Sequence, residues 1–140
     1  MFIKQLSIFV ENKPGRLHAI MDALGDNGIN ISALSIADTT DFGILRVIVD
    51  NIEKAREVLK EIGVISKVTD VIAVYIDDKV GGLAALLDHV SDAGLSINYM
   101  YAFLGRTEGK ALMVMKPDDM ENAVAMFESK GIKLAGPDEI

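Results

Sequence analysis

Apolar and polar positions in residues 1–70 alternate with the periods of strands and helices. Residues 2–10 are β-branched and apolar with a partial two-residue alternation, which predicts a strand with both faces partly covered. Further strands are predicted at 29–37, 44–49 and 64–69. The first helical stripe, spaced i, i+3, i+4 and i+7, consists of Leu17, Ile20, Met21 and Leu24. The inner face of a second helix is predicted from Ile52, Ala55, Val58, Leu59 and Ile62.

Glycine, proline and short polar residues set the predicted ends of these elements. Pro14 lacks an N–H group, so we expect it in the first turn of the first helix, where that donor would be unpaired. Gly25 and Gly28, with Asn27, are expected to end this helix. The other end signals are Asp50 or Asn51 as the cap of the second helix, Gly63 as its end, and residues 39–43 as a hairpin. The predicted order is strand, helix, strand, strand, helix, strand.

The pattern recurs in the second half of the chain. Residues 12–31 and 78–97 are related by a shift of 66 positions, and eight of the twenty pairs are identical. Matching signals predict strands at 71–76, 95–104, 111–115 and 132–135, a hairpin at 106–109, and a shift that grows to 68 near this hairpin. The first helical stripe of this half consists of Leu83, Leu86, Leu87 and Val90. The second helix is predicted to be capped by Asp118 or Asp119 and to end at Gly131, with Met120, Ala123, Val124 and Phe127 on its inner face.

The repeated order predicts an α+β protein of two ferredoxin-like βαββαβ units in tandem, each an antiparallel sheet with its helices on one face. We place the units at 1–70 and 71–140, with almost no linker and little freedom between them. The sheet face away from the helices is also expected to be apolar, with Leu45, Val47, Met113 and Met115 on it. The other unit or a second chain is then expected to cover this face.

Composition narrows the function classes. The net charge is −7, and neither half contains a cluster of Lys and Arg, so we expect no nucleic-acid or membrane partner. Without cysteine there is no disulfide, thiolate nucleophile or Cys-based metal site, and no metal or cofactor is predicted. No apolar run approaches the roughly 20 residues of a membrane span, and no signal peptide is evident. The expected location is cytoplasmic.

The turn before the first helix of each unit is the candidate ligand site. Backbone N–H groups at Gly15, Arg16 and Leu17 are expected to be free and to carry the positive end of the helix dipole, which suits an anion. The equivalent positions are Gly81, Gly82 and Leu83. Asn12 and Asn30 are expected nearby and would hold an ammonium group, so that an amino acid fits. The alternative is that Asn12 only caps the helix and Asn30 only ends a turn.

The motif Asn-x-Pro-Gly-x-Leu, followed by an amphipathic helix and Gly-Ile-Asn-Ile, resembles the opening of an ACT domain, a small regulatory unit that binds amino acids in many biosynthetic enzymes. The resemblance covers both units, and the first is also similar to the regulatory subunit of acetolactate synthase. By this resemblance, a ligand contacts Asn12, Gly15 and Asn30. In the second unit Asp78 replaces Asn12 and Ser96 replaces Asn30, with Asn98 two residues further on. The resemblance also implies that ligands bind between paired ACT units.

Two hypotheses follow, and neither assigns a catalytic residue. The first is a non-catalytic regulatory module that binds a small amino acid and signals to an enzyme of amino-acid metabolism, as a homo-oligomer, most simply a dimer. The alternative is an assembly module that mediates oligomerisation without a ligand. An enzyme has the least support, because no nucleophile, acid or base is set apart in the sequence.

Overall fold

The computed structural model describes residues 1–38, 41–105 and 108–140. They divide into a first unit, residues 4–69, and a second unit, residues 70–140 together with residues 1–3. The first unit contains β1 (Ile3–Glu11), α1 (Arg16–Asp26), β2 (Ile31–Asp38), β3 (Phe42–Val49), α2 (Ile52–Glu61) and the start of β4 (Ser66–Asp77). The second contains the rest of β4, α3 (Gly82–Asp92), β5 (Ile97–Ala102), β6 (Lys110–Pro117), α4 (Met120–Ser129), β7 (Leu134–Ala135) and a 3-10 turn (Pro137–Glu139).

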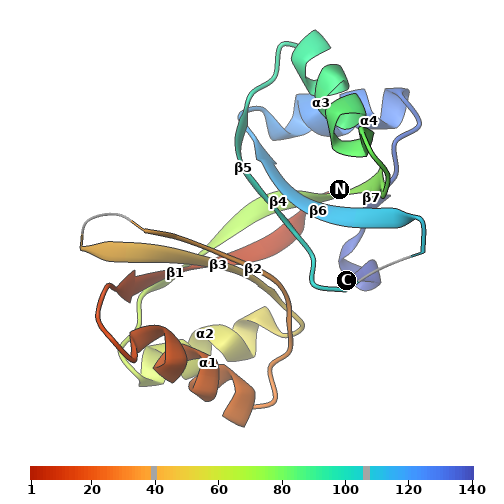
Figure 1. Cartoon of the computed structure of the whole chain (residues 1–140). Helices are drawn as coiled ribbons and strands as arrows, with labels where there is room; N and C mark the ends of the chain where they lie inside the picture. The colour runs from red at the N-terminus through yellow and green to blue at the C-terminus, as the bar shows by residue number, and fades with distance from the viewer. Residues whose placement is uncertain (39–40, 106–107) are drawn as a thin grey trace. The chain divides into compact units, whose positions relative to one another are not determined.

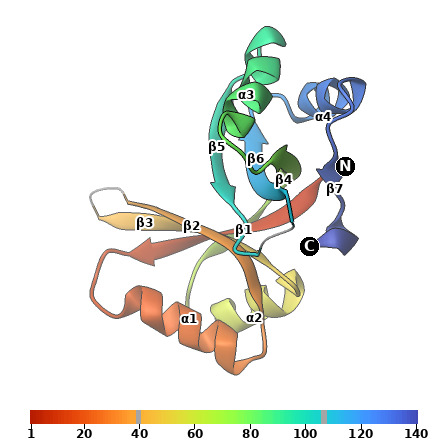
Figure 2. The same cartoon turned by 45° about the vertical axis from the view of Figure 1, so that its right-hand side comes forward.

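Each unit has the predicted βαββαβ order, and the α+β, ferredoxin-like fold class is confirmed. In the first unit the strand order is β2-β3-β1-β4, with β1 and β2 both antiparallel to β3. In the second unit β6 lies between β4 and β5, and β7 pairs with β4, all antiparallel. Within each unit the two helices cover one face of the sheet (Figures 1 and 2).

The core of each unit lies between its sheet and its helices. In the first unit the buried residues include Leu6, Ile8, Val10, Ile20, Leu24, Leu45, Val47, Ala55, Val58 and Leu59. In the second they are Ile72, Val74, Leu86, Val90, Met115, Ala123 and Phe127. The expectation that Leu45, Val47 and Met115 lie on the sheet face away from the helices is therefore wrong. Alternation identifies which residues share a face, but it does not say which of the two faces the helices cover.

The ends of the helices correct several predictions. Helix α1 begins at Arg16, and its N-cap is Gly15, so Pro14 lies in the preceding turn rather than in the helix. Gly25 lies inside α1, whose C-cap is Asn27, followed by the left-handed Gly28. Ile62, expected on the inner face of α2, is instead its C-cap residue and is 47% exposed. Leu17 and Leu83, expected in the apolar stripes, are 37% and 39% exposed because they lie at the open ends of their helices.

The capping alternatives are resolved in the same way in both units. Asn51 accepts a hydrogen bond from the Lys54 N–H at 3.1 Å and caps α2. Asp119 accepts one from the Asn122 N–H at 3.1 Å and caps α4. The preceding aspartates, Asp50 and Asp118, instead bind the chain just before β2 and β5. Each unit thus uses one polar side chain to cap its second helix, and the residue before it to hold the earlier connection between the first helix and the following strand.

Strand boundaries also differ from the predictions. The strands expected at 64–69 and 71–76 are one continuous strand, β4. The first hairpin is shorter than residues 39–43, because Phe42 and Gly43 pair in β3; residues 39 and 40 lie outside the described residues. The second hairpin, expected at 106–109, includes residues 106 and 107, which also lie outside them, while β6 begins at Lys110. The final strand is limited to Leu134–Ala135.

Two glycine substitutions test this packing. A Cβ at Gly82 would lie 2.0 Å from the Asp77 carbonyl oxygen, so we expect Gly82→Ala to lower the free energy of unfolding by about 1–3 kcal/mol. We expect a shift of the turn rather than loss of the fold, because Arg16 occupies the equivalent position in the first unit. Gly25→Ala, inside α1 with nothing within 4 Å, should stabilise by about 0.5–1 kcal/mol. Urea denaturation measures both; equal effects would contradict the packing described for Gly82.

Candidate ligand-binding site

The strand-to-helix turns of the two units have nearly the same backbone geometry. Gly15 has φ 85° and ψ −10°, and Gly81 has φ 81° and ψ −1°, both left-handed conformations that favour glycine. No atom lies within 4 Å of the position that a Cβ would take at either glycine. No neighbouring side chain therefore fills the space beside these glycines.

Hydrogen bonds account for some of the donors expected to be free. The Arg16 N–H donates to the Lys13 carbonyl oxygen at 3.3 Å, and the Gly82 N–H donates to that of Lys79 at 3.0 Å. The expectation of a free N–H at these two positions is therefore wrong. The first bonds of the helices run from Ala19 and Ala85 back to the two glycines. Among the described residues of these two turns and helix starts, no acceptor is found for the N–H groups of Gly15, Leu17 and His18 in the first unit, or of Val80, Gly81, Leu83 and Ala84 in the second.

Asn12 lies at the start of the turn, but it does not cap the helix. Its N–H donates to the Asp41 carbonyl oxygen at 3.1 Å, and its exposed side chain makes no capping bond to α1. The alternative that Asn12 only caps α1 is therefore wrong. Asp78 is held in the same way, through its N–H and the Gly109 carbonyl oxygen at 3.1 Å. Both polar side chains are exposed beside the open turn.

Asn30 lies at the opposite end of the first unit. Its N–H donates to Asp50 Oδ1 at 3.0 Å, and the Asp50 N–H donates to the Asn30 carbonyl oxygen at 3.1 Å. Asp41, beside Asn12, and Asp50 flank the eight residues of β3, which span about 27 Å. One small ligand cannot contact Asn12 and Asn30 of the same unit, so the expectation that they lie close together is wrong.

The second unit repeats this separation. Ser96 is bonded to Asp118, at the far end of β6 from Asp78 and Gly109. Asn98 is exposed on β5, one residue after that strand begins. Of the expected site residues, the structure groups those of each turn with each other, and it places Asn30, Ser96 and Asn98 elsewhere.

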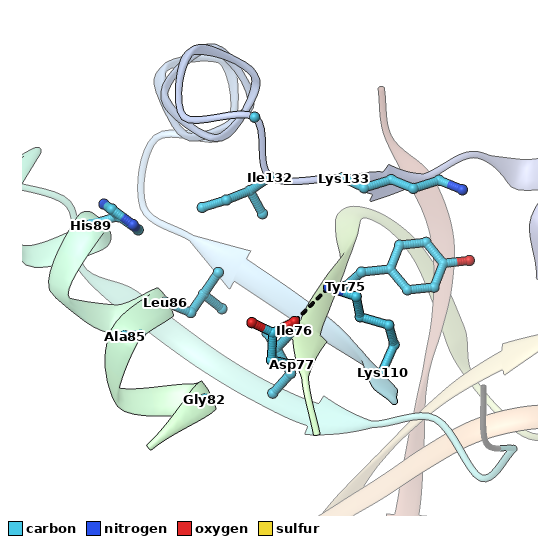
Figure 3. A pocket seen from close by; sticks show the side chains of 11 residues that line it. Tyr75, Ile76, Asp77, Gly82, Ala85, Leu86, His89, Lys110, Ile132 and Lys133 are labelled. Atoms are coloured by element: carbon cyan, nitrogen blue, oxygen red, sulfur yellow. Dashed lines mark hydrogen bonds and ion pairs between the residues drawn. The ribbon is translucent and has the colours of Figure 1, made fainter. Parts of the chain in front are cut away.

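A cavity of about 450 Å³ lies beside the turn of the second unit. Figure 3 shows Leu86 from α3 and Ile132, which follows α4, pointing towards each other across it, with Asp77 on another wall and His89 on α3. Lys133 runs beside the Tyr75 ring and away from Leu86 (Figure 3); its Nζ is 5.0 Å from the ring centre and 3.7 Å from Glu139 Oε2. The complete lining is Tyr75, Ile76, Asp77, Gly82, Ala85, Leu86, His89, Lys110, Gly131, Ile132 and Lys133.

The first unit has a corresponding cavity of about 290 Å³. Its lining is Phe9, Val10, Glu11, Arg16, Ala19, Ile20, Phe42, Ile62, Gly63, Val64 and Ile65. All of these except Ile62 match lining residues of the second cavity, with a shift of 66 before the hairpin and 68 after it. Sequence reasoning missed both cavities. A signal was available, because an acidic residue, Glu11 or Asp77, immediately precedes each of the repeated segments 12–31 and 78–97.

Each cavity has a carboxylate with nearby cations. Lys13 Nζ lies 3.2 Å from Glu11 Oε2, and Arg16 Nη2 lies 3.8 Å from Glu11 Oε1. The hydrogen bond and the charge of Lys13, followed by the charge of Arg16, lower the pKa of Glu11. In the second cavity Lys110 donates to Asp77, and Lys79 Nζ lies 3.9 Å from it. The hydrogen bond from Lys110, and then its charge, lower the pKa of Asp77.

Two further classes of site have no support in this structure. No group of three or more His, Asp or Glu side chains in the described residues is placed to hold a metal ion. Among the helices of the same residues, none is long and apolar enough to cross a membrane.

Comparisons with known proteins confirm the resemblance seen in the sequence. Residues 1–135 match the family model described as an ACT domain pair. The solved structure of protein BT0572 from Bacteroides thetaiotaomicron is 37% identical, with a TM-score of 0.92 over 99% of this chain and 95% of that chain. The ligand-free regulatory subunit of aspartate kinase from Thermus thermophilus shares the fold at 18% identity, with a TM-score of 0.65 over 90% and 91% of the two chains. None of the curated proteins matches the sequence.

The ion pair in the second cavity gives a testable pH effect. Because Lys110 is the largest cause of the lowered pKa of Asp77, Lys110→Met should raise that pKa towards its ordinary value near 3.8. Lys79→Met, the matched control, should raise it less. A lowered pKa in the folded state means that the stabilisation is present above the unfolded-state pKa and is lost as the pH falls through the folded-state pKa. NMR titration of the Asp77 carboxyl carbon measures the shift; equal effects of the two substitutions would contradict this assignment.

Proposed function

Because the chain belongs to the family of ACT domain pairs, we propose that it is a non-catalytic regulatory module that binds a small amino acid at its strand-to-helix turns and passes the signal to an enzyme of amino-acid metabolism. The observation that carries this proposal is the pair of matching open turns, at Gly15 and Gly81, with unbonded N–H groups at the helix starts. The shared fold with the regulatory subunit of an aspartate kinase agrees with this role.

The chemistry of the first turn suits a zwitterion. The N–H groups of Leu17 and His18 point out of the first turn of α1, where the helix dipole favours a carboxylate. The amide oxygen of Asn12 can accept a hydrogen bond from the ammonium group. In the second unit, Asp78 offers a carboxylate for the same purpose, which would strengthen the contact with an ammonium group.

The two carboxyl groups with clearly shifted pKa values do not point to acid–base catalysis. The carboxylates with clearly shifted pKa values, Glu11 and Asp77, are exposed and paired with cations, and their pKa values move down. A general acid or base working near neutral pH needs a carboxyl pKa that moves up. In a non-catalytic module, ligand binding acts by shifting an equilibrium between two conformations. A ligand shifts this equilibrium only if its affinities for the two conformations differ.

A thermal-shift screen against the twenty common amino acids tests the proposal. A ligand at one hundred times its Kd should stabilise the folded protein by about 2.7 kcal/mol, which raises Tm. The absence of any response from folded protein would remove the proposal.

Alanine substitutions then locate the response. Asn12→Ala should weaken binding because it removes the acceptor for the ammonium group. Asn30→Ala is the matched control, since Asn30 lies about 27 Å away at the far end of β3. If Asn30→Ala weakens binding as much as Asn12→Ala, the ligand is held by residues of more than one unit or chain.

A second candidate function is assembly, and exposed apolar side chains favour it. Phe42 and Ile65 in the first unit are 50% and 70% exposed, and Ile36 on the outer strand β2 is 51% exposed. An outer strand with apolar side chains is a ready surface for pairing with another chain. We propose that the chain forms a homodimer through this strand.

Light scattering during gel filtration tests this dimer. The native chain should elute with twice its 15.1 kDa mass. Ile36→Lys should shift it towards the monomer, because a lysine on an outer strand opposes edge-to-edge pairing. Ile62→Lys, at an exposed position outside the strand, is the control and should leave the mass unchanged. A monomeric native chain would contradict the dimer, and Asn12→Ala should not affect the mass.

A further inference from the structure

We propose that the mouth of the first cavity is a docking surface for a short segment of a partner protein, which places a large apolar side chain against it and an acidic side chain beside Arg16. The surface consists of four exposed side chains that line this cavity, here called the apolar rim: Phe9, Phe42, Ile62 and Ile65. The inference goes beyond the proposed function, because it names a protein partner by its chemistry and does not depend on whether an amino acid binds at the turns.

The apolar rim is continuous across three segments of the first unit. The Phe9 N–H donates to the Ile65 carbonyl oxygen at 3.1 Å, so these two residues are neighbours. Phe9 pairs with Ile44 on β3, which puts Phe42 at the diagonal position, within reach of an aromatic side chain. Ile62 lies at the end of α2, three residues before Ile65. The four side chains therefore form one exposed patch.

The second unit shows that the fold does not require apolar side chains at these positions. With the shift of 66 before the hairpin and 68 after it, the equivalents of the apolar rim are a tyrosine and three lysines: Tyr75, Lys110, Lys130 and Lys133. The backbone is nevertheless the same. The Tyr75 N–H donates to the Lys133 carbonyl oxygen at 3.0 Å, as in the equivalent bond of the first unit, and Lys130 is the C-cap of α4. Folding therefore does not explain the exposed apolar side chains of the first unit.

The second unit also shows how a chain segment can cover this position. Its 3-10 turn reaches two of the equivalent residues, because the Tyr75 hydroxyl donates to Glu139 Oε2 at 3.2 Å and Lys133 Nζ lies 3.7 Å from the same oxygen. In the first unit these two positions are Phe9 and Ile65, and the chain continues into β4 instead. A segment that covers them must therefore present an apolar side chain where the turn presents Glu139.

The size of the apolar rim decides between a short segment and a second copy of this chain. Its residues are 47% to 70% exposed, which amounts to roughly 300–400 Å² of apolar surface. A patch of this size is typical of the largest one on a monomer, which is often functional. A stable dimer needs about 800 Å² from each partner. The apolar rim alone is too small for a second copy, whereas it matches one or two side chains of a peptide segment.

The charges beside the apolar rim favour an acidic neighbour for the apolar side chain. Lys13 Nζ and Arg16 Nη2 lie 3.2 and 3.8 Å from the carboxylate of Glu11. Two cations share one carboxylate, so this group keeps a positive charge, although the whole chain has a net charge of −7. All three side chains are about half exposed or more, so a second carboxylate can approach Arg16 while it stays hydrated. An acidic side chain of the partner would balance the charge of the group.

Peptides based on the 3-10 turn of the second unit test the docking surface. The probe is acetyl-Gly-Pro-Asp-Phe-Ile-amide, which has the sequence of residues 136–140 with phenylalanine in place of Glu139; the unchanged pentapeptide is the matched control. In NMR titrations the probe should shift the amide signals of the apolar rim. It should bind at least about tenfold more tightly than the control, because it buries a phenyl group. Equal affinities of the two peptides, or shifts confined to the second unit, would overturn the inference.

A third peptide tests the charge. In acetyl-Gly-Pro-Lys-Phe-Ile-amide the aspartate of the probe is replaced by lysine, which would meet the positive charge of Lys13 and Arg16. This peptide should bind more weakly than the probe, and the difference should shrink at high salt, because the charges are exposed. Binding as tight as that of the probe would overturn the acidic neighbour.

A substitution taken from the second unit locates the contact. Ile65→Lys introduces the residue type that the second unit has at the equivalent position, so the fold should tolerate it. It should weaken binding of the probe at least about tenfold. Leu104→Lys, at an exposed apolar position of the second unit, is the matched control and should leave the affinity unchanged. Circular dichroism confirms that both variants are folded. Equal affinities of the two variants would place the contact elsewhere and overturn the inference.

Two further results distinguish this surface from the other proposals. If Ile65→Lys converts a dimeric chain into a monomer in light scattering, a second copy covers the apolar rim and the inference fails. If the probe binds while no amino acid raises Tm, the docking surface stands and the amino-acid proposal fails. The reverse result removes only the docking surface.

Discussion

The reversal of the chain from strand to helix at a left-handed glycine is the constraint on which the rest of each unit depends. At Gly15 and Gly81 the backbone has a conformation that a side chain would oppose, and it turns within four residues from a buried strand to a helix. This turn decides where the helix begins and which N–H groups stay unbonded. It also places the first helical residues beside the end of the strand, where the cavity is.

A second hydrogen-bonded connection completes each cavity. The Phe9 N–H donates to the Ile65 carbonyl oxygen at 3.1 Å, and the Tyr75 N–H donates to that of Lys133 at 3.0 Å. These bonds hold the segment that follows the second helix of each unit against the strand that precedes the unit's first helix, which is β1 in the first unit and β4 in the second. The cavity is the space that remains between this segment and the first helix, so it follows from the backbone of the fold and recurs although many of its side chains differ.

The repeat and the apolar periods were sufficient to predict the architecture, because a strand and a helix need different spacings of buried residues. The errors arose at residues that are compatible with more than one position in local structure. Gly25 is compatible with a helix interior as well as with its end, and Pro14 is compatible with a turn as well as with a first helical position. Either aspartate or asparagine could cap α2, and only the contact of Asp50 with the Asn30 N–H, twenty residues away, decides between them.

The site was harder to predict because its residues come from distant segments. Asn12 and Asn30 are separated by one helix in the sequence, which suggested that they lie close together, but the strand after the helix starts at the far end of the sheet. Glu11, Arg16, Phe42 and Ile65 line one cavity, although they come from β1, α1, β3 and the segment just before β4. Comparing the two halves position by position shows only part of the charge pattern, since Lys13 aligns with Lys79, whereas Arg16 aligns with a glycine and Lys110 aligns with a phenylalanine.

The difference between the two cavities follows from the same exchange of residues. Arg16 places a long side chain at the edge of the first cavity, whereas Gly82 places none, and the second cavity is the larger. The glycine also lets the start of α3 come so close to the Asp77 carbonyl oxygen that a Cβ would clash. Gly82 offers no cationic side chain in place of Arg16, and Asp77 pairs with Lys110 of β6 as well as with Lys79 of the turn. Because each cavity is lined only by residues of its own unit, a substitution in one lining leaves the other lining unchanged, while both units keep the same backbone design.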